Sequence, residues 1–156
     1  MTIYDDMQTD RVSELALRPP IRNKPTDSVR DAVVNMRAGK LGCTIVVDDD
    51  DKPIGVFTEA MLRQQFSHSN GVLDDELKSH MATTFAWVST SDPVETVLDA
   101  MELKNIRFVV VVNEDGTVAG LTGQKSLMEY VAEYFPGEVM VQRVGSQPFP
   151  DTREGA

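Results

Sequence analysis

The residues that could most readily do chemistry in this sequence are four consecutive aspartates at positions 48–51. Glu59 lies at the twelfth position of a segment that begins at Asp48, which is the spacing of a calcium-binding loop. Such loops need an oxygen ligand at the fifth position and a glycine at the sixth, but Lys52 and Pro53 stand there. We therefore interpret the acidic run as a solvated turn and predict no metal site.

The other reactive residues give little support for catalysis. Cys43 is the single cysteine, and neither His68 nor His80 has a recognisable second ligand or nucleophile partner. The sequence contains no nucleophile elbow, no glycine-rich phosphate loop with its lysine and no metal-ligand spacing. We predict that the chain is not an enzyme and that Cys43 is a small buried hydrophobic residue. Since a lone cysteine forms no internal disulfide, we also expect a reducing, cytoplasmic location.

Composition and charge exclude two classes of partner. Of the 156 residues, 41% are hydrophobic and 26% are charged, which is ordinary for a globular protein. The longest apolar run, residues 108–112, is far shorter than the roughly 18 residues needed to span a bilayer, so no membrane segment is predicted. A net charge of −10 argues against sequence-independent nucleic-acid binding, because counterion release needs clustered basic residues.

The chain contains an internal repeat. A shift of 65 residues moves Gly55 onto Gly120 and residues 46–47 onto residues 111–112 without a gap. The segments GVFTEAML (55–62) and GLTGQKSL (120–127) are therefore equivalent. A repeat constrains the architecture before any single element is assigned.

Each copy has the pattern of two helices. Residues 29–36 and 94–101 carry apolar side chains at positions i, i+3, i+4 and i+7, as in a helix with one buried face. Thr26 or Asp27 is expected to cap the first of these helices, and Asp92 the second, with Pro93 as its first residue. Further helices are predicted at residues 60–66 and 127–135, where the second ends at a Pro-Gly pair.

Each copy also has the pattern of three strands. CTIVVD (43–48) and FVVVVN (108–113) are rich in β-branched residues and too apolar to alternate, as expected of strands covered on both faces. Short polar turns then lead into PIGVF and VAGLT, which favours antiparallel hairpins. Weaker first strands are placed at PPIRN and FAWVS. Between the copies, Leu73, Leu77 and Met81 suggest a short helix in which Asp74 is spaced to meet Lys78.

The predicted fold class is α/β (α+β), with two βαββα repeats packed sheet to sheet about a pseudo-twofold axis. A small sheet with helices on one face cannot shield its own apolar surface, whereas two copies facing each other can. We predict an N-terminal extension at 1–11, repeat 1 at 12–69, a linker at 70–80, repeat 2 at 81–135 and a C-terminal tail at 136–156. The segment VMVQRV in this tail could add a strand or contact a partner subunit.

These features resemble a tandem pair of CBS (cystathionine-β-synthase-like) domains, known as a Bateman module. The resemblance covers roughly residues 12–135. It rests on TIVVD with GVFTEAM in the first copy, and on VVVVN with GLTGQKS in the second. It implies a regulatory protein that binds AMP, ADP, ATP, S-adenosylmethionine or a related compound between the repeats. It also implies a homodimer that transmits a change of shape to a protein partner.

The resemblance further implies two ligand pockets, each built from both repeats. One would join Ile21, Leu41, Gly42 and Cys43 to Gly123 and Ser126. The other would join Ala86, Ile106, Arg107 and Phe108 to Thr58 and Met61. By the same analogy, Arg107 would contact a phosphate, so this second pocket is ranked as the better phosphate site and the Ser126 pocket as the better ribose site.

The sequence departs from the family pattern at the residue that binds ribose. The family has an aspartate where this chain has Met61 and Ser126, and Gly123 replaces a threonine that the first copy keeps as Thr58. A thioether accepts hydrogen bonds only weakly, so the contribution of a charged hydrogen bond, roughly 1.5 to 3 kcal/mol, would be missing at Met61.

Several interpretations therefore stay open. Thr58 could cap a helix as well as contact a ligand, and Arg107 could lie over its own strand. The whole chain is either a nucleotide-binding sensor module or a ligand-free structural or adaptor dimer that has lost nucleotide recognition. An enzyme with an unfamiliar site is the third alternative.

Overall fold

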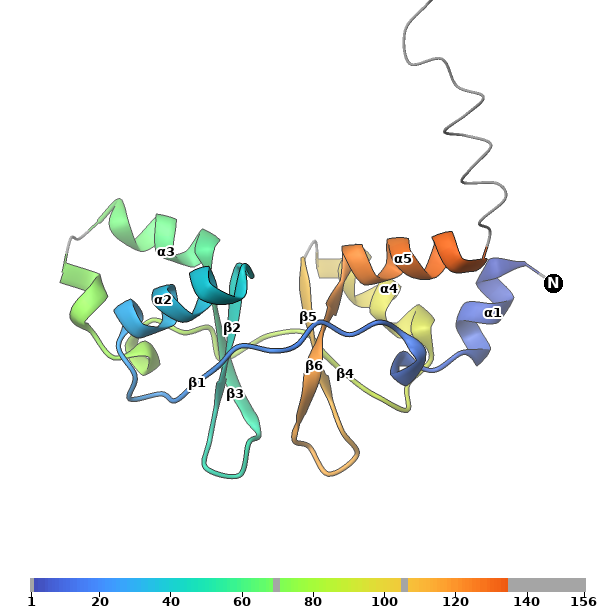
Figure 1. Cartoon of the computed structure of the whole chain (residues 1–156), viewed down its shortest axis with the longest axis horizontal. Coiled ribbons are helices and arrows are strands. Elements are labelled where there is room, and N and C mark those ends of the chain that lie inside the picture. Colours follow the sequence, from blue (N-terminus) through green and yellow to red (C-terminus); the bar gives the residue numbers. More distant parts are fainter. Residues whose placement is uncertain (1, 69–70, 105–106, 135–156) are drawn as a thin grey trace, which may run out of the picture.

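The computed structural model describes residues 2–68, 71–104 and 107–134, and the tail predicted at 136–156 lies outside them. Two three-stranded sheets meet at the centre of the molecule, with helices at both ends (Figure 1). The first half of the chain contains α1 (Ile3–Thr9), the 3-10 turn η1 (Val12–Glu14), β1 (Arg22–Asn23), α2 (Val29–Gly39), β2 (Cys43–Val47), β3 (Pro53–Thr58) and α3 (Glu59–Phe66). The second half contains η2 (Gly71–Asp74), η3 (Leu77–Ser79), β4 (Trp87–Ser89), α4 (Val94–Lys104), β5 (Phe108–Val112), β6 (Val118–Gly123) and α5 (Gln124–Tyr134).

The repeat read from the sequence is confirmed in the backbone. The sheets have the orders β1-β2-β3 and β4-β5-β6, and in each the first pair is parallel and the second antiparallel. Val46 pairs with Gly55 in the first sheet, and Val111 pairs with Gly120 in the second. Even the irregularity in register that follows these pairs recurs at the equivalent position of each hairpin.

The hydrophobic core has three parts, one between the two sheets and one on the outer face of each sheet. A central cluster joins β2 to β5 and β6 through residues that include Ile45, Val110 and Leu121. Each sheet also packs its other face against its own helices, around Phe57 in repeat 1 and Val109 in repeat 2. Strands β2 and β5 are therefore covered on both faces, as their uninterrupted apolar sequences predict. The predicted sheet-to-sheet packing is confirmed.

Close contact with the backbone of the other segment explains why each repeated segment begins with a glycine, Gly55 or Gly120. The segment before each first strand crosses to the other repeat, where Ala82 bridges β3 and Arg18 bridges β6. A Cβ added at Gly55 would lie 3.0 Å from the carbonyl oxygen of Ala82, and one at Gly120 would lie 3.1 Å from that of Arg18. Because both contacts are with backbone, only glycine leaves the crossing segment in place. Gly55 and Gly120 thus mark where the two repeats interlock.

The predicted helix caps are wrong by one or two residues. Helix α2 is capped by the Ser28 side chain, and the Asp27 carboxylate instead accepts hydrogen bonds from the Asn23 side chain and the Lys24 N–H. In repeat 2 the helix begins at Val94, after the predicted Pro93, and the Asp92 carboxylate accepts from the Ser89 N–H. In both repeats this aspartate closes the turn that leads from the first strand into the helix.

The connection between the repeats forms two 3-10 turns, η2 and η3, where a single short helix was expected. Asp74 pairs with Arg30 of α2 at 3.0 Å, and the predicted contact with Lys78 is not made, since Lys78 pairs with Glu76. Leu77 is fully buried in the core of repeat 1. The connection is therefore part of the folded core of repeat 1. Helix α5 likewise begins at Gln124, three residues before its predicted start, and Phe135 lies outside the described residues.

The N-terminal segment packs on repeat 2. Helix α1 lies beside α4 (Figure 1), and Met7, Val12 and Leu15 are buried in the outer core of repeat 2. The Tyr130 hydroxyl of α5 also donates a hydrogen bond of 2.7 Å to the Asp10 carboxylate. The start of the chain thus stabilises the half of the molecule that is farther away in sequence.

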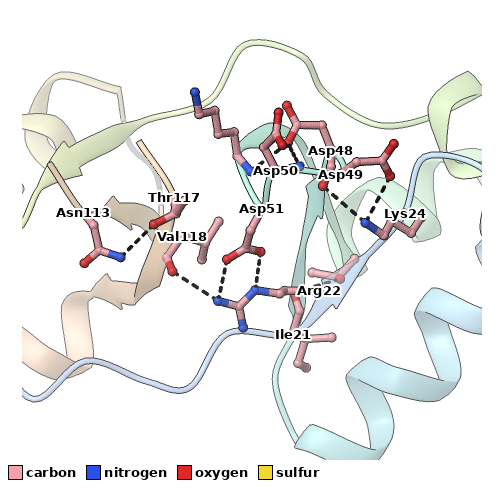
Figure 2. Close-up of polar contacts among 12 residues, drawn as sticks. Ile21, Arg22, Lys24, Asp48, Asp49, Asp50, Asp51, Asn113, Thr117 and Val118 are labelled. Carbon is pink, nitrogen blue, oxygen red and sulfur yellow. Dashed lines mark hydrogen bonds and ion pairs between the residues drawn. The ribbon is translucent and has the colours of Figure 1, made fainter. Parts of the chain in front are cut away.

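A polar clasp joins the two hairpins on one side of the molecule (Figure 2). The Arg22 guanidinium donates to both carboxylate oxygens of Asp51, at 2.7 and 3.2 Å, and to the Val118 carbonyl at 3.1 Å. The Val118 N–H in turn donates to the Asp51 carbonyl at 3.0 Å. The charged side chains are about 40% exposed, so the ion pair contributes at most about 1 kcal/mol. The clasp is one-sided, because Trp87 and Gly116 occupy the equivalent positions of repeat 2.

Candidate functional site

One cleft, cleft 1, lies between the repeats. Its volume is about 490 Å³, within the range of roughly 300–1,000 Å³ typical of small-molecule sites. Repeat 1 contributes residues of β2 and β3 and the first turn of α3, and repeat 2 contributes residues 84–86 and the start of β5. Its apolar lining includes Cys43, Val56, Phe85, Ala86, Phe108 and Val110. A flat apolar group such as a nucleobase suits this surface, since aromatic rings favour offset stacking.

The polar residues of cleft 1 come from α3 and its cap, from the segment before β4 and from the start of β5. They are Thr58, Glu59, Arg63, Thr84 and Arg107. The Thr58 hydroxyl oxygen accepts a hydrogen bond of 3.2 Å from the Met61 N–H, so Thr58 caps α3. Its hydroxyl proton can still be donated to a ligand. The helix-cap interpretation of Thr58 is therefore correct, and its contact with a ligand stays a prediction.

Met61 does not line cleft 1. Its partly buried side chain packs against the outer core of repeat 1, on the side of the sheet that holds Phe57. An acidic group is nevertheless present, because Glu59 reaches the cleft two residues earlier. Its carboxylate lies next to Gly42, where an added Cβ would be 3.2 Å from Glu59 Oε2. Sequence reasoning missed Glu59, although its place directly after the Thr58 cap was a usable signal.

A smaller cleft, cleft 2, has a volume of about 280 Å³ and a basic lining. Arg18 comes from the crossing segment and Lys40 from the end of α2, where its backbone is left-handed with φ 52°. Arg107 precedes β5, and Lys125 lies in the first turn of α5. The described residues that line cleft 2 include no carboxylate. Cleft 2 therefore has the electrostatic character of an anion site.

Ser126 and Gly123 form the wall of cleft 2. Ser126 is only 2% exposed, and its hydroxyl donates a hydrogen bond of 3.1 Å to the Ala16 carbonyl, which ties α5 to the N-terminal segment. Gly123 pairs with Phe108, and a Cβ there would collide with the Arg107 carbonyl oxygen. The serine hydroxyl is thus engaged by backbone, and the glycine keeps the wall close to Arg107.

The predicted pocket residues divide between the two clefts. Of the pocket predicted around Ser126, the residues at cleft 2 are Leu41, Gly42, Gly123 and Ser126. Cys43 lines cleft 1 instead, and Ile21 packs between the central core and the outer core of repeat 1. Of the pocket predicted around Thr58, the residues at cleft 1 are Thr58, Ala86, Arg107 and Phe108. Ile106 lies outside the described residues. Ligand contact by any of these residues stays a prediction.

Cys43 is a buried thiol. The residue is 1% exposed, and burial raises the pKa of its thiol to about 12. A thiol with this pKa stays protonated at neutral pH, whereas the thiolate is the nucleophile. The side chain therefore provides apolar wall to cleft 1.

The described residues contain neither a metal-binding cluster nor a membrane-spanning helix. Within 2–68, 71–104 and 107–134, no group of three or more His, Cys, Asp or Glu side chains is placed to hold a metal ion. In the same residues, no helix combines the length and the apolar character required to cross a membrane.

Comparison with known proteins agrees with this architecture. A family model described as CBS domain matches residues 12–68 and 76–133. Protein PAE2072 from Pyrobaculum aerophilum, a CBS domain protein solved in complex with AMP, is 28% identical, with a TM-score of 0.67 over 76% of this chain and 90% of that one. The CBS domain pair of protein MJ0100, solved with 5′-methylthioadenosine and S-adenosyl-L-methionine, is 18% identical, with a TM-score of 0.70 over 80% of this chain and 98% of that one. That likeness shows the fold alone.

Curated relatives match at a similar level of identity. The uncharacterized protein MK0525 of Methanopyrus kandleri is 28% identical over 132 residues. This match covers 79% of the present chain and 63% of MK0525. The chain thus spans less than two thirds of that relative.

Proposed function

The chain belongs to the CBS domain family, and from that premise we propose that it is a regulatory module that binds an adenine nucleotide in cleft 1. The observation that carries this proposal is the composition of cleft 1, in which an apolar surface from both repeats adjoins one acidic, two hydroxyl and two basic side chains. We propose a binding role and no catalytic one.

Each part of a nucleotide has a matching group in cleft 1. The base would lie against Phe85 and Ala86, which belong to repeat 2. The Glu59 carboxylate would accept hydrogen bonds from the ribose hydroxyls, in place of the aspartate that the family has at Met61. Arg107, which lines both clefts, would neutralise the first phosphate at the edge of cleft 1, and Arg63 would add positive charge to the same cleft. The AMP bound to PAE2072, a relative at 28% identity, supports this class of ligand.

We propose that the ligand acts by changing the geometry between the repeats of a homodimer. Large apolar side chains are exposed on three helices: Val34 on α2, Phe66 on α3 and Met128 on α5. A second copy could cover such helix faces, and a protein partner could then sense the shape of the dimer. A ligand shifts such an equilibrium only by its difference in affinity for the two shapes, typically about 1–3 kcal/mol of coupling.

Nucleotide binding is expected to raise the stability of the protein. At 100 times its dissociation constant, a ligand that binds only the folded state adds about 2.7 kcal/mol to the free energy of unfolding. Chemical denaturation with and without AMP, ADP, ATP or S-adenosylmethionine measures this gain. Glu59→Gln should lower the affinity for the compound that stabilises the protein most, because a neutral amide replaces a charged acceptor. The control Glu76→Gln, at an exposed residue, should leave that affinity unchanged.

A second candidate function is a ligand-free adaptor dimer. It is favoured by the burial of Met61 against the core of repeat 1 and by the engagement of the Ser126 hydroxyl with Ala16, since both family ribose positions are then occupied by structural contacts. Unchanged stability with all four compounds at millimolar concentration would contradict nucleotide binding and support the adaptor.

A further inference from the structure

We propose that clefts 1 and 2 form one continuous site for a single nucleoside polyphosphate, with the nucleoside in cleft 1 and the phosphate chain in cleft 2. This inference rests on the proposed function and adds the class of ligand. It assigns different tasks to two clefts that the repeat would otherwise make equivalent.

The two clefts share part of their walls. Gly42, Arg107 and Phe108 line both of them, so the clefts meet at the starts of β2 and β5. Gly42 and Arg107 are equivalent residues of the two repeats, and they therefore lie where the repeats face each other. A ligand anchored in cleft 1 reaches cleft 2 by passing Arg107, which can contact its first phosphate.

The charges in cleft 2 fit an extended anion. Arg18, Lys40, Arg107 and Lys125 converge there, and in the described part of the chain none of the four forms an ion pair. The whole chain carries a net charge of −10, so carboxylates are abundant elsewhere. Four basic groups with no ion-pair partner among the described residues give this small cleft a positive potential, which attracts an anion with several charges.

The equivalent positions of the two repeats have diverged in charge. Glu59 of cleft 1 corresponds to Gln124 of cleft 2, and Ala60 corresponds to Lys125. Compared with the first turn of α3, the first turn of α5 therefore lacks an acidic side chain and has gained a basic one. A carboxylate suits ribose hydroxyls and repels phosphate, whereas lysine attracts phosphate. The divergence thus separates nucleoside recognition from phosphate recognition.

The start of α5 adds to the anion site. Gln124, Lys125 and Ser126 form its first turn, where backbone N–H groups lack helical partners and the helix dipole is positive. Lysine is unfavourable in a first turn for the same reason, and α5 has no acidic residue there to compensate. By contrast, α3 places Glu59 in its first turn. The cost of Lys125 is removed when a phosphate group occupies cleft 2.

The volumes of the clefts agree with this division. Cleft 1, at about 490 Å³, lies within the range of roughly 300–1,000 Å³ for small-molecule sites, whereas cleft 2, at about 280 Å³, is the smaller of the pair. We therefore assign the bulkier nucleoside to cleft 1 and the narrower chain of phosphates to cleft 2.

Isothermal titration calorimetry with adenosine, AMP, ADP and ATP, at fixed ionic strength and without divalent cations, tests the inference. We expect one ATP per chain and at least about tenfold tighter binding of ATP than of AMP, because the added phosphates gain charged contacts in cleft 2. Inorganic tripolyphosphate should compete with ATP but not with adenosine. The variant Lys125→Ala places at this position the alanine that repeat 1 has at Ala60. It should lose most of the extra affinity for ATP over AMP and keep its affinity for AMP within about twofold.

The matched control is Lys52→Ala, a lysine in the β2–β3 turn that lines neither cleft. It should leave the affinities for AMP and ATP unchanged, and the melting temperatures of both variants without ligand check that they are folded. Equal affinity for AMP and ATP, two AMP molecules per chain, or equal losses of AMP and ATP affinity in Lys125→Ala would overturn the spanning site and leave the proposed function standing. Failure of all four nucleosides and nucleotides to bind would overturn both.

Discussion

Replacing Leu77 with alanine is expected to lower the free energy of unfolding by about 2–5 kcal/mol. Leu77 lies in η3, in a connection whose composition suggests a surface linker, but its side chain is fully buried among α2, β3 and η2. Truncation removes buried apolar surface and leaves a cavity that the backbone cannot close easily, since the Leu77 N–H donates a hydrogen bond of 2.8 Å to the Asp27 carbonyl oxygen. Urea denaturation, extrapolated linearly to water, gives the change.

The neighbouring Lys78→Ala is the control for Leu77→Ala. Lys78 is exposed and makes one surface ion pair with Glu76, so its loss should change stability by no more than about 0.5 kcal/mol. If both variants were equally stable, the connection would be a surface linker, and its assignment to the core of repeat 1 would be wrong.

Replacing Gly123 with alanine is expected to cost about 1–3 kcal/mol and to deform cleft 2. The new methyl group would collide with the Arg107 carbonyl oxygen, which is backbone and has no rotamer to change. The end of β6 must then move away from β5 at the pair Gly123 and Phe108. Urea denaturation measures the change in stability, and titration calorimetry measures the affinity for ATP, which should fall if cleft 2 is deformed.

Gly39→Ala is the matched control for Gly123→Ala. A methyl group at Gly39 would contact side-chain atoms of Ile21, with Cδ1 at 2.7 Å and Cγ1 at 3.2 Å, and the short contact is with the terminal atom rather than with backbone. Gly39 is also the last residue of α2. Alanine there should change stability by less than about 0.5 kcal/mol and leave ATP binding unaltered. A Gly123→Ala variant as stable as Gly39→Ala, with unchanged ATP affinity, would show that Arg107 yields freely and that Gly123 does not define the wall.

The strands and the duplicated fold could be predicted because their signals are local or periodic. Residues 43–47 and 108–112 are apolar at every position, and burial on both faces of β2 and β5 follows directly from that pattern. The spacing from Gly55 to Gly120 fixed the equivalence of the repeats. That these glycines mark the crossing points, in close contact with Arg18 and Ala82, required the structure.

The cap of α2 and the N-terminal packing could not be predicted from local signals. Thr26, Asp27 and Ser28 are all good cap residues, and the choice of Ser28 depends on the carboxylate of Asp27 being engaged by Asn23 and Lys24. Helix α1 is short, and isolated helices of its length are not stable in water. It is held by packing on α4, which is distant in sequence.

The candidate site was only partly predictable for the same reason. Thr58, Ala86 and Phe108 were found because they follow from the repeat and the family pattern. Glu59 was missed although its place after the Thr58 cap was a usable signal. Other missed residues are Arg63, Arg18, Lys40 and Lys125, because surface charges on helices and on a crossing segment carry no motif. Their convergence depends on how the repeats face each other. The ranking of the two predicted pockets also depends on how the repeats face each other. Because the lining of cleft 2 is basic, we reverse the ranking made from the sequence and propose cleft 2 as the phosphate site and cleft 1 as the ribose site.

ATP-induced changes in the amide ¹H–¹⁵N NMR spectrum show directly whether a nucleotide binds between the two repeats. The largest shifts are expected on both repeats at once, at Thr58 and Glu59 of repeat 1 and at Ala86 and Phe108 of repeat 2, with smaller shifts along α1. Saturating ATP that leaves these amides unshifted, or that shifts only amides on the outer helix faces, would contradict binding between the repeats.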